Sequence, residues 1–277
     1  MKKLVPDFRK MKQNGEKISM LTAYDYPSAQ WAEEAGIDTL LVGDSLGMVV
    51  LGYESTVPVT MEEIIHHTKA VRRGAANTFI VSDMPFMSYC TMDLALINAG
   101  RLIKEGGADA VKLEGGSDFA PLVQALTQAG IPVVAHIGLT PQTSTKLGGF
   151  KVQGRDLESA KRLVNDAYAL EKAGAFLLTL EAIPRQLAKQ ISSELKIPTI
   201  GIGAGNDCDG QVLVFHDMLG LFKRFKPKFV KQYALLGQAA LEAMQAYHKE
   251  VKSGEFPAEE NSWALSDEVF QKLYGNK

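Results

Sequence analysis

One short phrase recurs along the chain at the points that decide its fold: EAGID at residues 34–38, EGGAD at 105–109 and KAGA at 172–175. In each phrase a glycine ends a helix-forming segment, and a short apolar run begins directly after it. Two further junctions, QAGIP at 128–132 and LKIP at 195–198, carry a proline at the entrance of the apolar run. Each junction therefore predicts the end of a helix followed by a buried strand.

The same alternation of apolar runs and amphipathic segments extends over most of the chain. The predicted strands are 18–23, 39–42, 78–82, 110–113, 132–136, 175–180, 198–202 and 212–215. The predicted helices between them are 27–35, 60–73, 91–105, 118–129, 156–173 and 184–195. Eight strand and helix units in one chain predict a closed (β/α)8 TIM barrel of the α/β class. The rival, an open doubly wound sheet, needs a glycine-rich turn after its first strand, where this chain has Ala23-Tyr24-Asp25-Tyr26.

Two segments lie outside the repeat. Residues 5–14 predict a short helix that closes the bottom of the barrel, and residues 227–249 predict a longer amphipathic helix followed by a polar tail. No linker or change of composition divides the chain. We therefore expect a single barrel domain over 1–277, with an N-terminal capping helix and a C-terminal helical extension.

The composition narrows the class of protein. Of the 277 residues, 46% are hydrophobic and 22% are charged, as in globular proteins, and the net charge of -2 offers no field to hold nucleic acid. No signal peptide and no apolar run of membrane-spanning length is present, so we expect a cytoplasmic protein that binds no membrane. Cys90 and Cys208 are far apart and outside any CxxC motif, which favours two reduced thiols over a zinc or disulfide site.

Carboxylates follow several of the predicted strands. Asp44, Asp83 and Glu114 follow the second, third and fourth strands, and Glu181 follows the sixth. Because the carboxyl ends of barrel strands meet at one rim, we expect these side chains to become neighbours and to repel one another unless a cation neutralises them. Oxygen ligands favour Mg²⁺, whereas zinc is disfavoured because only His136 stands at a strand end and no thiol joins it.

A 2-oxo acid can chelate a magnesium ion at this rim through its carboxylate and carbonyl oxygens. The ion would act as a Lewis acid, and the adjacent C–H would become acidic enough for a protein base to remove. Glu181 suits that base, since it ends an apolar strand at the mouth. Lys112 lies inside an apolar strand, where a functional role is favoured over a structural ion pair with Glu114.

Each of these residues also has a simpler interpretation. An Asp at a strand end often caps the next helix, and Glu181 could interact with a helix dipole. His136 is equally consistent with a hydrogen-bonded core histidine and with a substrate contact. The loop Gly201-Ile202-Gly203-Ala204-Gly205 could bind an anion or only permit close packing.

Several blocks of the sequence resemble the ketopantoate hydroxymethyltransferase family. They occur in order between about residues 18 and 217: LTAYD (21–25), VGDSLGM (42–48), His67 with VRRG (71–74), DMPFM (83–87), VKLEGG (111–116), HIGLTPQ (136–142) and GIGAG (201–205). The resemblance implies a barrel of the phosphoenolpyruvate/pyruvate class. It also implies transfer of a one-carbon unit from 5,10-methylenetetrahydrofolate to 3-methyl-2-oxobutanoate through a metal-stabilised enolate, giving 2-dehydropantoate for pantothenate biosynthesis.

The resemblance further implies roles for individual residues. Asp44, Asp83 and Glu114 match the family's Mg²⁺ site, Glu181 matches its proton acceptor, and the oxo-acid contacts match Asp44, Ser45, Asp83 and Lys112. We add His136 to the oxo-acid contacts. The family also implies a homodecamer, to which the C-terminal segment would contribute, although Asn261-Ser262-Trp263 departs from a His-Ser-Phe-like ending and the residues after Trp263 form an extra tail.

Two other functions stay open at this level. A magnesium-dependent lyase or mutase of the same superfamily would share the acidic rim, but neither cysteine lies in the loop that such enzymes carry over the site. A barrel that only senses or stores an oxo acid would need neither Lys112 nor Glu181.

Overall fold

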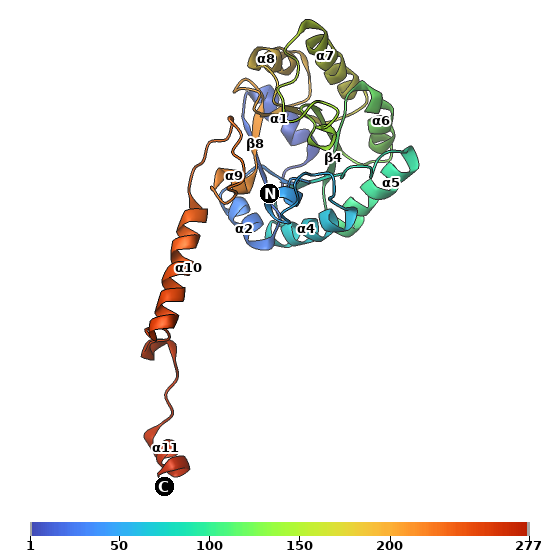
Figure 1. Cartoon of the computed structure of the whole chain (residues 1–277). Coiled ribbons are helices and arrows are strands. Elements are labelled where there is room, and N and C mark those ends of the chain that lie inside the picture. The colour runs from blue at the N-terminus through green and yellow to red at the C-terminus, as the bar shows by residue number, and fades with distance from the viewer. Residues whose placement is uncertain (1, 276–277) are drawn as a thin grey trace.

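The computed structural model describes residues 2–275 and shows a closed barrel of eight parallel strands (Figure 1). The strands are β1 (Ile18–Thr22), β2 (Thr39–Val42), β3 (Phe79–Asp83), β4 (Ala110–Glu114), β5 (Val133–Gly138), β6 (Leu177–Glu181), β7 (Thr199–Ile202) and β8 (Gly210–Leu213). Neighbours in sequence pair in order, and β8 pairs with β1. The predicted TIM barrel is confirmed. The two ends of the predicted domain over 1–277 lie outside the described residues.

Helices surround the barrel at the predicted positions. They are α2 (Tyr26–Glu34), α4 (Met61–Gly74), α5 (Met92–Arg101) with a π-helical continuation at Leu102–Gly106, α6 (Ala120–Gln128), α7 (Leu157–Lys172) and α8 (Arg185–Glu194). Several of their starts are capped by side chains, as where Asp25 accepts a hydrogen bond from the backbone N–H of Ser28. At the recurring phrases, Gly36 and Gly174 adopt φ of 76° and 102°, a backbone conformation that favours glycine and ends the helix.

The core has two parts, one inside the barrel and one between the strands and the helices. The barrel interior is filled by side chains that point inward from alternate strand positions, among them Met20, Val81 and Ile200. Helix α1 (Val5–Asn14) places Phe8 against this interior, with its ring centroid 5.1 Å from that of Phe79. Because Phe79 is the first residue of β3, α1 covers the amino ends of the strands and leaves the carboxyl ends open.

The C-terminal part differs from the prediction. The predicted helix over 227–249 is wrong at its start, because helix α10 runs from Leu236 to Ser253 and residues 227–235 are irregular. In that stretch the backbone N–H of Tyr233 donates to the carbonyl of Met218, and that of Leu236 donates to Leu219. These long-range bonds replace the bonds of a helical turn. The eighth strand also ends two residues early, since α9 (Phe215–Met218) follows it.

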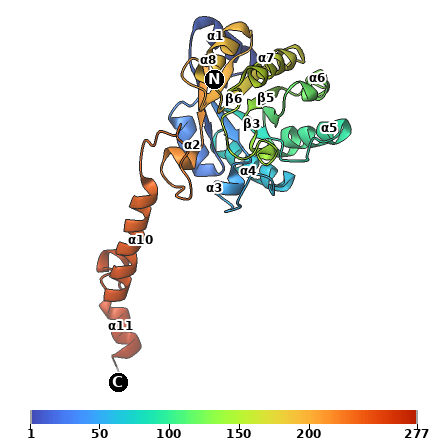
Figure 2. The ribbon, with the colours of Figure 1, turned by 45° about the horizontal axis from the view of Figure 1, so that its top comes forward.

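Helix α10 leaves the barrel and projects away from it, and the predicted polar tail beyond it contains a further helix, α11 (Asp267–Tyr274) (Figures 1 and 2). Nearly every residue of these two helices is exposed. A one-turn helix, α3 (Leu46–Val49), also follows β2 and was not predicted. Within residues 2–275 no helix combines the length and the apolar character needed to cross a membrane.

Candidate active site

Adjacent strands bring a buried lysine and two carboxylates into direct contact at the open end of the barrel. Lys112 on β4 lies opposite Asp83 on β3, and its Nζ donates to Asp83 Oδ1 over 2.7 Å. Asp83 Oδ2 accepts a hydrogen bond of 3.0 Å from the backbone N–H of Asp44. All three side chains are buried. Lys112 therefore pairs with Asp83, and not with Glu114 as its simpler interpretation supposed, because strand register places Asp83 directly across from it.

Gln142 connects the remaining carboxylates and was not singled out from the sequence. Its Nε2 donates to Asp44 Oδ2 (2.8 Å), and its backbone N–H donates to Glu114 Oε2 (3.0 Å). Its Oε1 accepts a hydrogen bond of 2.5 Å from the hydroxyl of Tyr89. Gln142 is buried in the short turn after β5, and it orients two of the three predicted metal ligands without carrying a charge. Only its place in the block HIGLTPQ could have drawn attention to it.

The cluster holds more negative than positive charge. Burial, reinforced by Asp83 and Glu114, raises the pKa of Asp44 well above its usual range. Burial alone would lower the pKa of Lys112, but Asp83, Glu114 and Asp44 together raise it. The site therefore disfavours the simultaneous ionisation of Asp44, Asp83 and Glu114, and an added cation would reduce the repulsion between their carboxylates. The excess of buried oxygen donors fits a hard divalent ion such as Mg²⁺.

The carboxylates do not yet form a complete metal shell. In the described part of the chain, no three His, Cys, Asp or Glu side chains are arranged so that they could together hold a metal ion. Asp83 and Glu114 instead direct oxygens at Lys112 and at the backbone of Gln142. Because Mg²⁺ commonly binds through one or two carboxylates and keeps several waters, the arrangement still fits this ion.

His136 links the acidic cluster to Glu181. Its Nδ1 lies 3.5 Å from Glu114 Oε1 and its Nε2 lies 3.2 Å from Glu181 Oε2, and neither contact has the geometry of a good hydrogen bond. Burial alone would lower the pKa of His136, but the two carboxylates raise it to about 9. The imidazole is therefore charged at neutral pH, and it lies in the cavity between the two acids.

The backbone around Glu181 is tightly constrained. Glu181 is the last residue of β6 and pairs in register with Gly138, where a Cβ would collide with the Glu181 carbonyl oxygen. That oxygen accepts a hydrogen bond from the backbone N–H of Leu139, and the next N–H, of Ala182, donates to the carbonyl of Ile202. Ala182 itself has φ of 46°, a conformation that a residue with a Cβ rarely adopts. Neighbouring strands thus fix the direction in which Glu181 leaves the sheet.

All seven predicted site residues line one cavity of about 420 Å³ at the mouth of the barrel: Asp44, Ser45, Asp83, Lys112, Glu114, His136 and Glu181. Ser45 Oγ lies 2.8 Å from the hydroxyl of Tyr24. The cavity also contains the buried hydroxyls of Thr56 and Thr179, which have no hydrogen-bond partner among residues 2–275. Sequence reasoning missed both because isolated threonines carry no distinctive signal. The predicted glycine loop packs closely, since a Cβ at Gly203 would lie 2.7 Å from the Phe229 ring.

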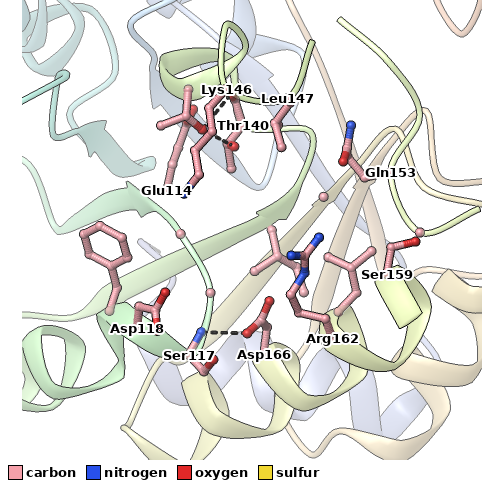
Figure 3. Close-up of a pocket in the computed structure, with 18 of the residues that line it drawn as sticks. Glu114, Ser117, Asp118, Thr140, Lys146, Leu147, Gln153, Ser159, Arg162 and Asp166 are labelled. Atoms are coloured by element: carbon pink, nitrogen blue, oxygen red, sulfur yellow. Dashed lines mark hydrogen bonds between the residues drawn. The ribbon is translucent and has the colours of Figure 1, made fainter. Parts of the chain in front are cut away.

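A second cavity of about 400 Å³ lies on the outer side of β4 and β5 (Figure 3). Its lining includes Lys146 and Arg162. Two other lining residues are joined by a 2.8 Å hydrogen bond from the backbone N–H of Ser117 to Asp166 Oδ1. Glu114 lines both cavities. The two cavities therefore meet at this residue.

Comparison with known proteins identifies the family of the chain. A family model described as ketopantoate hydroxymethyltransferase matches residues 2–259. The chain belongs to the ketopantoate hydroxymethyltransferase family. The chain is 58% identical over 271 residues to a 3-methyl-2-oxobutanoate hydroxymethyltransferase of Carboxydothermus hydrogenoformans, covering 98% of both chains. It is 57% identical to the enzyme of the same name from Thermus thermophilus, covering 95% of this chain and all of the other.

Solved structures share the barrel of this ketopantoate hydroxymethyltransferase family member at much lower identity. A phosphonopyruvate hydrolase crystallised with oxalate and Mg²⁺ has a TM-score of 0.63 at 14% identity, covering 99% of this chain and 95% of its own. A 2,3-dimethylmalate lyase of the phosphoenolpyruvate mutase/isocitrate lyase superfamily has a TM-score of 0.58 at 16% identity, covering 97% and 94%. These likenesses show that the chain shares the barrel fold of the two structures.

Proposed function

We propose that the protein transfers a one-carbon unit from 5,10-methylenetetrahydrofolate to C3 of 3-methyl-2-oxobutanoate, giving 2-dehydropantoate for pantothenate biosynthesis. Water supplies the hydroxyl oxygen, and tetrahydrofolate is the second product. The observation that carries the proposal is the juxtaposition, in one cavity, of the buried Lys112–Asp83 pair and the His136–Glu181 pair. The first pair provides charge for binding and polarising an oxo acid, and the second provides a base.

The oxo acid would bind on the β2–β4 side of the cavity. Ser45 Oγ can hydrogen-bond its oxygens, and Lys112 places a fixed positive charge where the enolate oxygen develops. The base would be Glu181, which takes the C3 proton. His136 Nε2 lies 3.2 Å from Glu181 Oε2, so the imidazole can orient that carboxylate and can also contact the substrate's carboxylate.

Asp44, Asp83 and Glu114 are the residues that would hold Mg²⁺ in this proposal. When bound, the ion supplies a Lewis acid that makes the C3–H of the oxo acid more acidic. The raised pKa of Asp44 supports the assignment, since its carboxyl is strongly disfavoured as an anion without an added cation. Mn²⁺ has the same preference for oxygen ligands and is an alternative to Mg²⁺ at these residues.

The cavity also has room for the folate. A volume of about 420 Å³ exceeds what a five-carbon acid fills, and its outer wall is apolar, with Phe150, Phe222 and Phe229 around the mouth. Aromatic walls of this kind can stack on a flat ring such as a pterin. The donor would therefore enter above the oxo acid, on the side where Glu181 stands.

We also propose that copies of the chain assemble, as the homodecamer that the family resemblance implies, and that the protein is cytoplasmic. Helix α10 supports assembly because one of its sides carries Leu241, Met244, Tyr247 and Val251, all exposed, while the helix projects from its own barrel (Figure 2). An amphipathic helix gains most of its stability by packing its apolar side. A second copy of the chain would provide the surface for that side.

Product formation in the presence and absence of a chelator tests the proposed function. The purified protein with Mg²⁺ and both substrates should form 2-dehydropantoate, and ethylenediaminetetraacetate should abolish the reaction until excess Mg²⁺ is added. Chromatography of the acid product with mass detection measures both results. A reaction that persists in the chelator would remove the metal from the proposal, and failure to use this oxo acid would overturn the assignment of the substrate.

A further inference from the structure

One carboxylate in the active-site cavity has no partner among the described residues. Asp217 in α9 lines the cavity, yet within residues 2–275 its side chain forms no hydrogen bond and no ion pair. The other four carboxylates there are all engaged: Asp44, Asp83 and Glu114 through Gln142, Lys112 or backbone amides, and Glu181 with His136. A carboxyl left without a partner beside apolar walls is available to a ligand.

The position of Asp217 places it on the donor's side of the cavity. In the ring of strands, β8 lies opposite β4, and α9 directly follows β8. The oxo-acid contacts come from β2 to β4, whereas Asp217 shares its side of the mouth with the apolar segment that contains Phe222 and Phe229. A flat nitrogen heterocycle stacked against that segment would meet the carboxyl group of Asp217.

We infer that Asp217 is a further catalytic residue, which donates a proton to a nitrogen of the one-carbon donor. The inference rests on the proposed function. As the enolate carbon bonds to the donor's methylene carbon, one of the two C–N bonds of that carbon breaks and its electron pair stays on the nitrogen. That nitrogen takes the proton from Asp217, and solvent reprotonates the carboxylate. Water then replaces the second C–N bond, so that the product keeps the hydroxyl group and the released tetrahydrofolate keeps the proton.

The electrostatic surroundings suit this role. Burial raises the pKa of Asp217 to about 6, so both of its protonation states are accessible near neutral pH. The titratable groups beside it are the hydroxyl of Tyr24 and the imidazole of the adjacent residue His216, and Lys228 lines the same cavity. Burial lowers the pKa of His216 and raises that of Tyr24, so neither of these two adds charge beside Asp217 near neutral pH.

The test compares two reactions of the full-length protein with Mg²⁺. Exchange of the oxo acid's C3 proton into deuterated water needs no donor, whereas transfer needs both substrates. In Asp217→Asn, kcat for transfer should fall about 100-fold or more, the usual contribution of a general acid, while exchange stays within about threefold of the wild type. Asp217→Glu should restore transfer to within about tenfold. The falling limb near pH 6 in the wild-type pH profile of transfer should be absent in Asp217→Asn.

Asp207→Asn is the matched control. Asp207 is on the loop after β7 and pairs with Lys189 outside the cavity, so its removal should leave both reactions unchanged. The inference is overturned if Asp217→Asn transfers at the wild-type rate, or if exchange and transfer fall together, which would indicate a structural role. Absence of both reactions in the wild type would instead reject the proposed function itself.

Discussion

The two sides of the barrel mouth differ in how completely their charged groups are paired. On the β2–β4 side, Asp44, Asp83, Lys112 and Glu114 are buried and each has a defined partner. On the β6–β8 side, Glu181 is only loosely matched by His136, and Thr179 and Asp217 have no side-chain partner in the described chain. The paired side is built to hold a ground-state anion in one place, and the unpaired side retains groups that can exchange protons. Variants on the two sides should therefore fail in different ways.

The largest effect is expected on the unpaired side, from Glu181→Gln. The amide cannot accept the C3 proton, so exchange of that proton into deuterated water should fall by about 10²–10⁴-fold. Binding of the oxo acid should weaken much less, because its contacts lie on the other side of the mouth. Proton NMR follows the exchange, and calorimetric titration measures the binding. Exchange at the wild-type rate in this variant would show that Glu181 is not the base, and the proposed difference between the two sides would then be wrong.

On the paired side, Lys112→Met should act on stability as well as on binding. It leaves Asp83 without its cation in a buried site, which should lower the free energy of unfolding by about 3 kcal/mol at pH 7. Urea titrations of wild type and variant measure this.

Lys161→Met is the control for that change, since Lys161 is exposed on α7 and pairs only at the surface. It should stay within about 0.5 kcal/mol of the wild type. An equal loss in the two variants would mean that the buried pair has no special importance.

The smallest effect is expected at the junction of the two sides, in His136→Gln. The pKa of His136 is about 9 in the folded chain and near 6.5 when unfolded, so its charge stabilises the fold fully below pH 6.5. That contribution is lost as the pH rises through about 9. The difference in unfolding free energy between wild type and variant should therefore shrink from pH 6 to pH 9.5. His248→Gln, on the exposed α10, should give no such slope. A constant difference for His136→Gln would show that the imidazole is neutral in the folded protein.

The barrel could be predicted from sequence because its signals are local. Glycine after a helix and a branched apolar run are properties of neighbouring residues, and most predicted strands and helices match the structure to within one or two positions. The start of α10 could not be predicted in this way. Its boundary depends on hydrogen bonds from the backbone N–H groups of Tyr233 and Leu236 to the carbonyls of residues 218 and 219. The sequence pattern within 227–249 does not indicate these distant partners.

The candidate site shows the same division. The acidic side chains follow from one geometric rule, that the carboxyl ends of parallel strands share a rim, so the order of the strands alone was enough to group Asp44, Asp83 and Glu114. Gln142 and Thr179 could not be found in this way, because an uncharged residue becomes informative only through its contacts. Asp217 lies two residues past the end of the predicted eighth strand, as Asp44 does past the second, so the same rule could have found it.

The left-handed backbone of Ala182 has a consequence for engineering. Holding a residue with a Cβ at φ of 46° costs on the order of 1–2 kcal/mol, and the penalty is located directly beside Glu181. A glycine there would remove the steric penalty and at the same time widen the range of directions open to the adjacent carboxylate. Such a substitution would raise thermal stability but would hold the catalytic carboxylate less precisely. Selection for thermal stability alone would therefore favour a more stable enzyme with a lower turnover.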